Sequence, residues 1–120
     1  MEPSRDDKTI FLINLISFHE HASEETRTVA REACERLGEE CGGKKAGILL
    51  WNVAPNLDLR KNVHLVEVAL FESDDALQAF RNHPAHMKFA AVLRGAADWK
   101  IGKIPGSFLS KFFQPGIGIF

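Results

Sequence analysis

Two histidines that lie close together in the chain carry its clearest chemical signal. They are His83 and His86, in the segment H-P-A-H-M-K-F that spans residues 83–89. Imidazole suits proton transfer because its pKa lies near neutrality. We therefore regard His86 as the leading candidate for an acid or base, and we expect His83 to cap the helix that Pro84 begins. The alternative for His86 is a structural role, with its ring hydrogen-bonded to nearby backbone.

A further histidine stands near the start of a strand-like segment. Residues 63–71, V-H-L-V-E-V-A-L-F, are largely apolar and rich in valine. Side chains alternate along a strand, so His64 and Val66 should share one face while Glu67 points to the other. We interpret Glu67 as an interfacial hydrogen-bonding group rather than a base. A water-exposed histidine at the strand end is the alternative for His64.

The elements that must position these residues can be predicted from hydrophobic periodicity and from cap residues. Ser23 and Ser73 are good N-caps, and Gly42-Gly43 should end the first helix. The last helix should end at Gly95 or Asp98. The expected strands are residues 9–18, 46–53, 63–71 and 99–104, and the expected helices begin at residues 23, 73 and 84.

The resulting order is β-α-β-β-α-α-β, which is typical of a ferredoxin-like α+β fold. The loop at residues 54–62 is too short for a crossover, so the strands that flank it should be antiparallel. We expect a four-stranded antiparallel sheet with its helices on one face. In a monomer the other face would be bare, and we assign Leu65, Ala69 and Phe71 to it. A second copy would cover such a face, so a homodimer is expected.

The order of strand, F-E-S turn, helix and H-P-A-H resembles the stress-responsive α/β-barrel (Dabb) family. Residues 63–89 also resemble the olivetolic acid cyclase-type polyketide cyclases within it. The resemblance implies a dimeric α/β barrel formed by residues 1–104. It further implies a small-molecule enzyme of natural-product biosynthesis, a lyase or isomerase that needs no cofactor.

The reaction that this resemblance implies is cyclisation, aldol-type condensation or isomerisation of a polyketide-like carbonyl compound. In it, His86 would be the catalytic acid or base, and His64 would polarise the substrate. The hydrophobic substrate would contact five apolar side chains, namely Phe11, Ile13, Val66, Phe80 and Phe89.

The chain also departs from the cyclases that it resembles. They have a tyrosine at the position of Phe80, and this chain contains no tyrosine. No Asp or Glu follows Asp98, so the partner that orients His86 would be Asp98, another carboxylate or a backbone carbonyl. A non-catalytic stress-associated or ligand-binding barrel is therefore the alternative function. Haem-dependent or oxygen-using barrels of similar fold form a third class, which nothing in the sequence favours.

Composition limits the class of protein. The chain has 120 residues, 45% of them hydrophobic and 26% charged, which is typical of one globular domain. A formal net charge of −1 gives no field that attracts nucleic acid, and no apolar run reaches the roughly 18–20 residues of a membrane span. We expect a cytoplasmic protein that binds neither nucleic acid nor membrane. His19 and His21 lack a third ligand, so we expect no metal.

Two features remain, the cysteines and the C-terminal segment. Cys34 and Cys41 lie seven residues apart in one predicted helix, about 10 Å, which is too far for a disulfide. Residues 105–120 form an apolar extension with four phenylalanines, whose burial contributes on the order of 1.5–3 kcal/mol each. We interpret this extension as a strap across the dimer or a lid over a ligand cavity.

Overall fold

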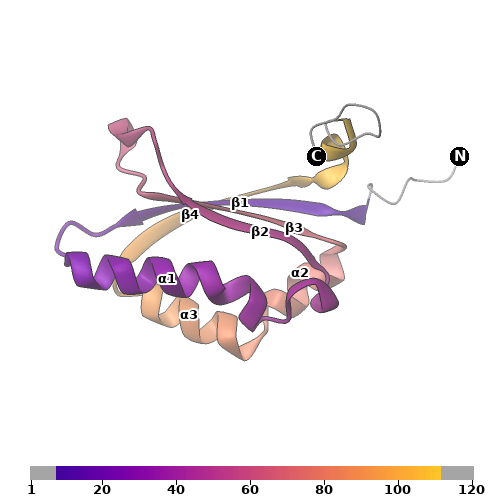
Figure 1. Cartoon of the computed structure of the whole chain (residues 1–120), viewed down its shortest axis with the longest axis horizontal. Coiled ribbons are helices and arrows are strands. Elements are labelled where there is room, and N and C mark those ends of the chain that lie inside the picture. The colour runs from indigo at the N-terminus through magenta and orange to yellow at the C-terminus, as the bar shows by residue number, and fades with distance from the viewer. Residues whose placement is uncertain (1–7, 112–120) are drawn as a thin grey trace, which may run out of the picture.

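A four-stranded sheet carries the α-helices on one of its faces (Figure 1). This computed structural model describes residues 8–111. The strands are β1 (Ile10–Phe18), β2 (Ile48–Pro55), β3 (Leu65–Phe71) and β4 (Ala97–Pro105). The α-helices are α1 (Glu24–Glu40), α2 (Asp74–Arg81) and α3 (Pro84–Arg94), and short 3-10 turns are η2 (Gly43–Ala46), η3 (Leu59–Lys61) and η4 (Gly106–Lys111).

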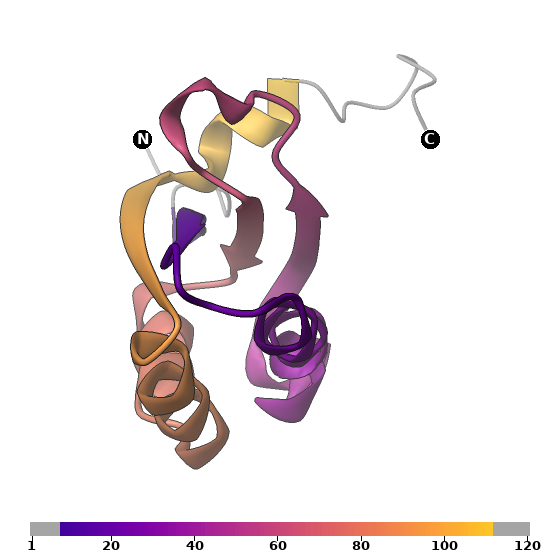
Figure 2. The same cartoon turned by 90° about the vertical axis from the view of Figure 1, so that its left-hand side faces the viewer.

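The strand order is β2-β3-β1-β4, and every neighbouring pair is antiparallel. Helix α1 packs against β2, and α3 packs against β4, so the two helices lie under opposite halves of the sheet (Figure 2). The predicted ferredoxin-like α+β fold with its four-stranded antiparallel sheet is confirmed. Within residues 8–111, no helix is long and apolar enough to span a bilayer.

The helix ends follow the predicted cap chemistry. The Ser23 hydroxyl accepts the backbone N–H of Thr26 at 3.1 Å, and Ser73 accepts that of Ala76 at 3.1 Å. After α1, Gly42 adopts a φ of 111°, which strongly favours glycine. Pro84 begins α3, and His83 Nδ1 accepts the N–H of Ala85 at 3.0 Å. The predicted capping role of His83 is confirmed.

The predicted phase of β3 is wrong. Leu65, Ala69 and Phe71 are buried and share the face covered by the helices, instead of forming the bare face. Val66 lies on the opposite, uncovered side. The predicted phase also placed Glu67 on the bare face, where a charged residue is normally found. Glu67 is nevertheless buried beneath the helices, with 4% of its surface exposed.

The side of the sheet on which no α-helix of residues 8–111 lies, called the open face below, is mostly apolar. It consists of residues that alternate with the buried ones along each strand. Its large apolar members are Phe11, Ile13, Leu15, Leu50, Val66, Val68, Leu70 and Ile104. The turn η4 lies on this side of the sheet (Figure 1), where the ring of Phe108 meets that of Phe11 edge-on at 5.3 Å. Residues 112–120 of the predicted extension lie outside the described residues.

Close packing between α1 and β2 depends on a glycine. The Trp51 indole N–H donates to the Cys34 carbonyl at 3.0 Å, which holds the ring against α1. A Cβ atom at Gly38 would lie 2.6 Å from Trp51 Cγ, closer than packed atoms approach. Cys34 and Cys41 are both buried and free, so the prediction that they do not bridge each other is confirmed.

We therefore predict that Gly38→Ala destabilises the protein although alanine favours helix. The clash with Trp51 should cost about 1–3 kcal/mol, more than the roughly 0.5–1 kcal/mol gained in helix propensity. Thermal unfolding should show a Tm several degrees lower. Gly95→Ala is the control, because its Cβ would meet nothing nearer than 3.6 Å. Equal Tm values for the two variants would contradict this account of the packing.

Candidate functional site

A cavity of about 230 Å³ lies between the covered face of the sheet and the helices. Most of its wall is apolar, and its polar side chains come from β1, β3, α2 and α3. The lining residues are Leu12, Asn14, Leu37, Glu67, Phe80, Arg81, His86, Phe89, Ala90, Leu93, Trp99 and Ile101. An apolar enclosure with a few polar groups is the usual form of a small-molecule site.

His86 enters this cavity from the first turns of α3. Its Nδ1 lies 3.2 Å from the Arg81 carbonyl oxygen, which can only accept a hydrogen bond. The proton of the neutral ring is therefore on Nδ1, and the lone pair is on Nε2. Burial lowers the pKa of His86, and the Arg81 carbonyl opposes this shift while the Arg81 charge adds to it. The ring is thus held as a neutral base.

The partner that orients His86 is a backbone carbonyl, one of the three alternatives that the sequence left open. Asp98 is occupied elsewhere, because its Oδ1 lies 3.3 Å from Nε2 of His19 at the edge of the sheet. The centroid of the Phe80 ring lies 4.6 Å from that of His86, so Phe80 packs against the imidazole. Phe80 therefore contributes packing against His86 but no hydroxyl that could bind a substrate carbonyl.

The second polar group of the cavity is a pair that sequence reasoning missed. Asn14 and Glu67 face each other across β1 and β3, and Asn14 Nδ2 donates to Glu67 Oε1 at 3.3 Å. Burial raises the pKa of Glu67 to about 7, and the Asn14 hydrogen bond only partly opposes it. The expectation that Glu67 faces a dimer interface is wrong, because it lies under the helices.

A signal for this pair was present in the sequence. Asn14 is the one amide in a strand that is otherwise almost entirely apolar, and Glu67 is the one charge in β3. Side chains point alternately to the two faces along each strand, so the side chains of Asn14 and Glu67 could lie on the same face of the sheet. A polar residue within a buried strand is unfavourable unless it has a partner or a function.

Two of the five predicted substrate-contacting residues, Phe80 and Phe89, line the cavity. Phe11, Ile13 and Val66 do not, because they lie on the open face of the sheet. The expectation that all five line one pocket is therefore wrong. The error follows from the phase of the strands, since a shift by one residue moves every side chain to the other face.

His64 is also placed away from His86. Its Nδ1 accepts the backbone N–H of Phe18 at 2.9 Å, and its ring lies 5.7 Å from the Phe18 ring. It is not among the residues that line the cavity. The expectation that His64 lines the same pocket as His86 is wrong, and the contact with Phe18 gives it a structural role at the end of β1.

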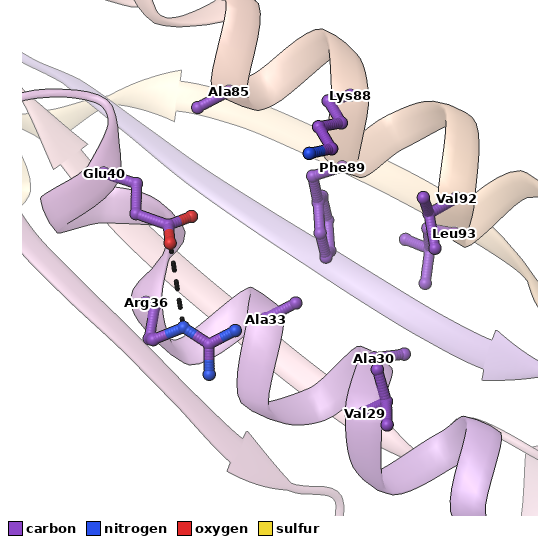
Figure 3. A pocket seen from close by; sticks show the side chains of 10 residues that line it. All are labelled: Val29, Ala30, Ala33, Arg36, Glu40, Ala85, Lys88, Phe89, Val92 and Leu93. Atoms are coloured by element: carbon purple, nitrogen blue, oxygen red, sulfur yellow. Dashed lines mark ion pairs between the residues drawn. The ribbon is translucent and has the colours of Figure 1, made fainter.

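A second hollow, the outer groove, lies between α1 and α3 and has a volume of about 460 Å³ (Figure 3). Alanine and valine side chains form much of its wall, and Arg36 and Glu40 pair at 3.7 Å at its edge. Phe89 extends from α3 into this space in Figure 3. Phe89 and Leu93 line both the outer groove and the inner cavity, so they form the boundary between the two.

The other potentially reactive side chains give less indication of a chemical role. Burial raises the pKa of the Cys34 thiol, which disfavours the nucleophilic thiolate. His19 and His21 stack with ring centroids 5.3 Å apart. In the part of the chain that the structure describes, no three His, Cys, Asp or Glu side chains are grouped to hold a metal ion.

We predict that Glu67→Gln changes how stability depends on pH. The pKa of Glu67 is raised from 4.5 to about 7, so the folded state binds more protons between these values and loses stability as pH rises. Gln carries no charge, so the variant should gain on the order of 3 kcal/mol over wild type between pH 4.5 and pH 8.

Urea unfolding at several pH values measures this difference, and the titration of His86 cancels because both proteins contain it. Glu72→Gln is the matched control, since it removes an exposed carboxyl just after the same strand. A constant difference between Glu67→Gln and wild type from pH 4.5 to 8 would show that the carboxyl is not perturbed in this way.

Solved structures with this fold support the architecture. A dimeric ferredoxin-like protein of unknown function from Thermobifida fusca superposes with a TM-score of 0.71 at 17% identity, covering 82% of this chain and 91% of that one. Hydroxynitrile lyase from Passiflora edulis gives 0.69 at 12% identity, covering 82% and 93%. SnoaB, a cofactor-independent oxygenase from Streptomyces nogalater, gives 0.63 at 14% identity, covering 81% and 91%.

At these identities the superpositions show the fold alone. A search among curated proteins found no match to the chain. The family model described as the stress responsive A/B barrel domain, Dabb, does match, and it spans residues 10–101. That range contains every strand residue that positions the cavity, together with the H-P-A-H segment. The chain therefore belongs to the family of stress-responsive A/B barrel domains.

Proposed function

We propose that this protein is a cofactor-independent small-molecule enzyme in which His86 acts as acid and base on a polyketide-like carbonyl compound. The observation that carries the proposal is the state of the His86 ring. Its Nδ1 proton is held by the Arg81 carbonyl, and its Nε2 has no hydrogen-bond partner among residues 8–111. A neutral imidazole with a free lone pair beside an apolar cavity is suited to remove a proton from carbon.

The reaction begins when Nε2 takes the proton on the carbon next to the substrate carbonyl. The resulting enolate attacks a second carbonyl in an aldol-type cyclisation, or it is reprotonated at another carbon in an isomerisation. In both cases the imidazolium returns its proton, so His86 ends neutral. Because burial lowers the pKa of His86, the base form predominates at pH 7 before each turnover.

The solved structures of similar fold make such an activity plausible. They include SnoaB, which is described as a cofactor-independent oxygenase, and a hydroxynitrile lyase. A ligand-binding protein without catalysis is the second candidate. It is favoured by the His86–Arg81 hydrogen bond and the Phe80 contact, which would also suit a purely structural histidine.

Proton exchange distinguishes the two candidates without knowledge of the natural substrate. We predict that the wild-type protein accelerates exchange of the α-protons of 4-phenyl-2-butanone in D₂O, followed by NMR. His86→Gln should lower this rate by roughly 10²–10⁴-fold, the usual contribution of general acid–base catalysis. His21→Gln, at an exposed histidine, is the control. Equal rates in wild type and His86→Gln would leave the binding protein as the better reading.

We also propose that two copies associate through the open faces of their sheets. This surface is mostly apolar, and no α-helix among residues 8–111 lies on it. Large apolar patches of this kind mark association surfaces. Structures of similar fold, including the one from Thermobifida fusca, are described as dimeric. Two sheets packed face to face would form the dimeric α/β barrel.

We predict a mass of about 27 kDa in solution, twice the chain mass of 13.4 kDa, by light scattering at micromolar concentration. Ile13→Glu should yield the monomer, because its cross-strand neighbours Val68 and Gly102 offer no cation to pair with the new carboxylate. Met87→Glu, at an exposed site on α3, should remain dimeric. A monomeric wild-type protein would contradict the proposed barrel.

A further inference from the structure

Two oxygen atoms in the wall of the inner cavity have no hydrogen-bond partner among the described residues. They are Asn14 Oδ1 and Glu67 Oε2. The two side chains are 8% and 4% exposed, and both line the cavity. Folding leaves buried oxygens unpaired only at a cost in free energy, so a group that supplies the missing partners would bind well.

The neighbours on the sheet cannot supply these partners. On β1 the pair is flanked by Leu12 and Ile16, and on β3 by Leu65 and Ala69, all of them buried and apolar. The two polar side chains already share their one mutual hydrogen bond, from Asn14 Nδ2 to Glu67 Oε1. The free oxygens can therefore accept a hydrogen bond from a molecule inside the cavity that they line.

We propose that Asn14 and Glu67 form a binding site for the oxygen of a small apolar phenol or enol, whose single hydroxyl proton is shared between the two free oxygens. This inference rests on the proposed function, since the enol form of a carbonyl substrate would present this group to the pair. The apolar remainder of the molecule would contact Phe80, Phe89 and Leu93.

The chemistry of the pair suits both forms of an enolisable compound. An ionised Glu67 accepts from an enol hydroxyl, whereas a protonated Glu67 donates to a ketone oxygen. Burial places the pKa of Glu67 at about 7, so both forms are populated near neutral pH. The other titratable groups close to it are Cys34 on α1, Arg81 on α2 and His86 on α3.

Proton transfer balances if the pair acts together with His86. The α-carbon loses its proton to His86 Nε2 while the Glu67 carboxyl gives its proton to the carbonyl oxygen. The products are the enol, an imidazolium and an ionised carboxylate, and the reverse steps return both protons. No oxidant, reductant or further reactant is needed.

Binding of two matched probes tests the site without any turnover. NMR titration at pH 8 would compare 3-ethylphenol with ethylbenzene, which differ by one hydroxyl. We expect wild type to bind the phenol about tenfold to a hundredfold more tightly, as for a hydrogen bond to a charged group. Equal affinities would show that water alone occupies the pair, and no binding of either probe at millimolar concentration would also overturn the site.

Substitution of both residues of the pair tests whether Asn14 and Glu67 are the groups that bind the phenol hydroxyl. In the double variant Asn14→Leu/Glu67→Leu, apolar side chains of similar size replace the pair, so the fold should be retained. It should still bind ethylbenzene, and its preference for the phenol should fall to within about twofold. A preference that survives in this variant would overturn the proposal, because the hydroxyl would then bind elsewhere.

His86→Gln separates the two proposals. It should keep the preference for the phenol while losing α-proton exchange of 4-phenyl-2-butanone. If the preference is kept and exchange is also unchanged, the binding site stands and the proposed catalysis fails. If the preference is lost in His86→Gln, the hydroxyl binds His86 and the assignment to Asn14 and Glu67 fails.

Discussion

The cross-strand pair of Asn14 and Glu67 is the constraint on which the rest of the covered face depends. It divides the core into two apolar clusters, one containing Leu12 and Phe71 and the other containing Ile16 and Leu65. An uninterrupted core would have close-packed this region. The polar pair instead coincides with a cavity, and the helices close over it from both sides. The two clusters therefore stabilise the fold, and the cavity between them holds the polar groups on which the proposed chemistry depends.

Local features of the H-P-A-H segment position the His86 ring in the cavity. Pro84 starts α3 and His83 caps it, so the break between α2 and α3 is fixed within two residues. That break leaves the Arg81 carbonyl near the end of α2 close to Nδ1 of His86. A backbone carbonyl is a hydrogen-bond acceptor that does not titrate and has no side-chain rotamers. It therefore holds one tautomer of the ring without depending on the protonation or rotamer of a carboxylate. This explains how the site does without an acidic residue beyond Asp98.

The fold could be predicted from the sequence because its signals are local. Ser23, Ser73, Pro84 and the two glycines after α1 each fix a helix boundary through hydrogen bonds or backbone geometry near that boundary. The phase of β3 could not be predicted in this way. Both of its faces are apolar apart from Glu67, so hydrophobicity does not distinguish them, and the one ionisable residue of the strand lies on the buried face. Val66 was misplaced by that error, and Phe11 and Ile13 by the same error of phase in β1.

Successive residues of each strand point to opposite faces of the sheet, so the open face and the cavity face are built from alternating side chains of the same strands. On β1, Ile13 and Leu15 belong to the open face while Asn14 between them reaches the cavity. A change in one face therefore leaves the side chains of the other in place, although each strand carries both. Association through the open face would bury the outer side of the strands that hold Asn14 and Glu67. The sheet would then be fixed from both sides, and the geometry of the cavity would no longer depend on the helices alone.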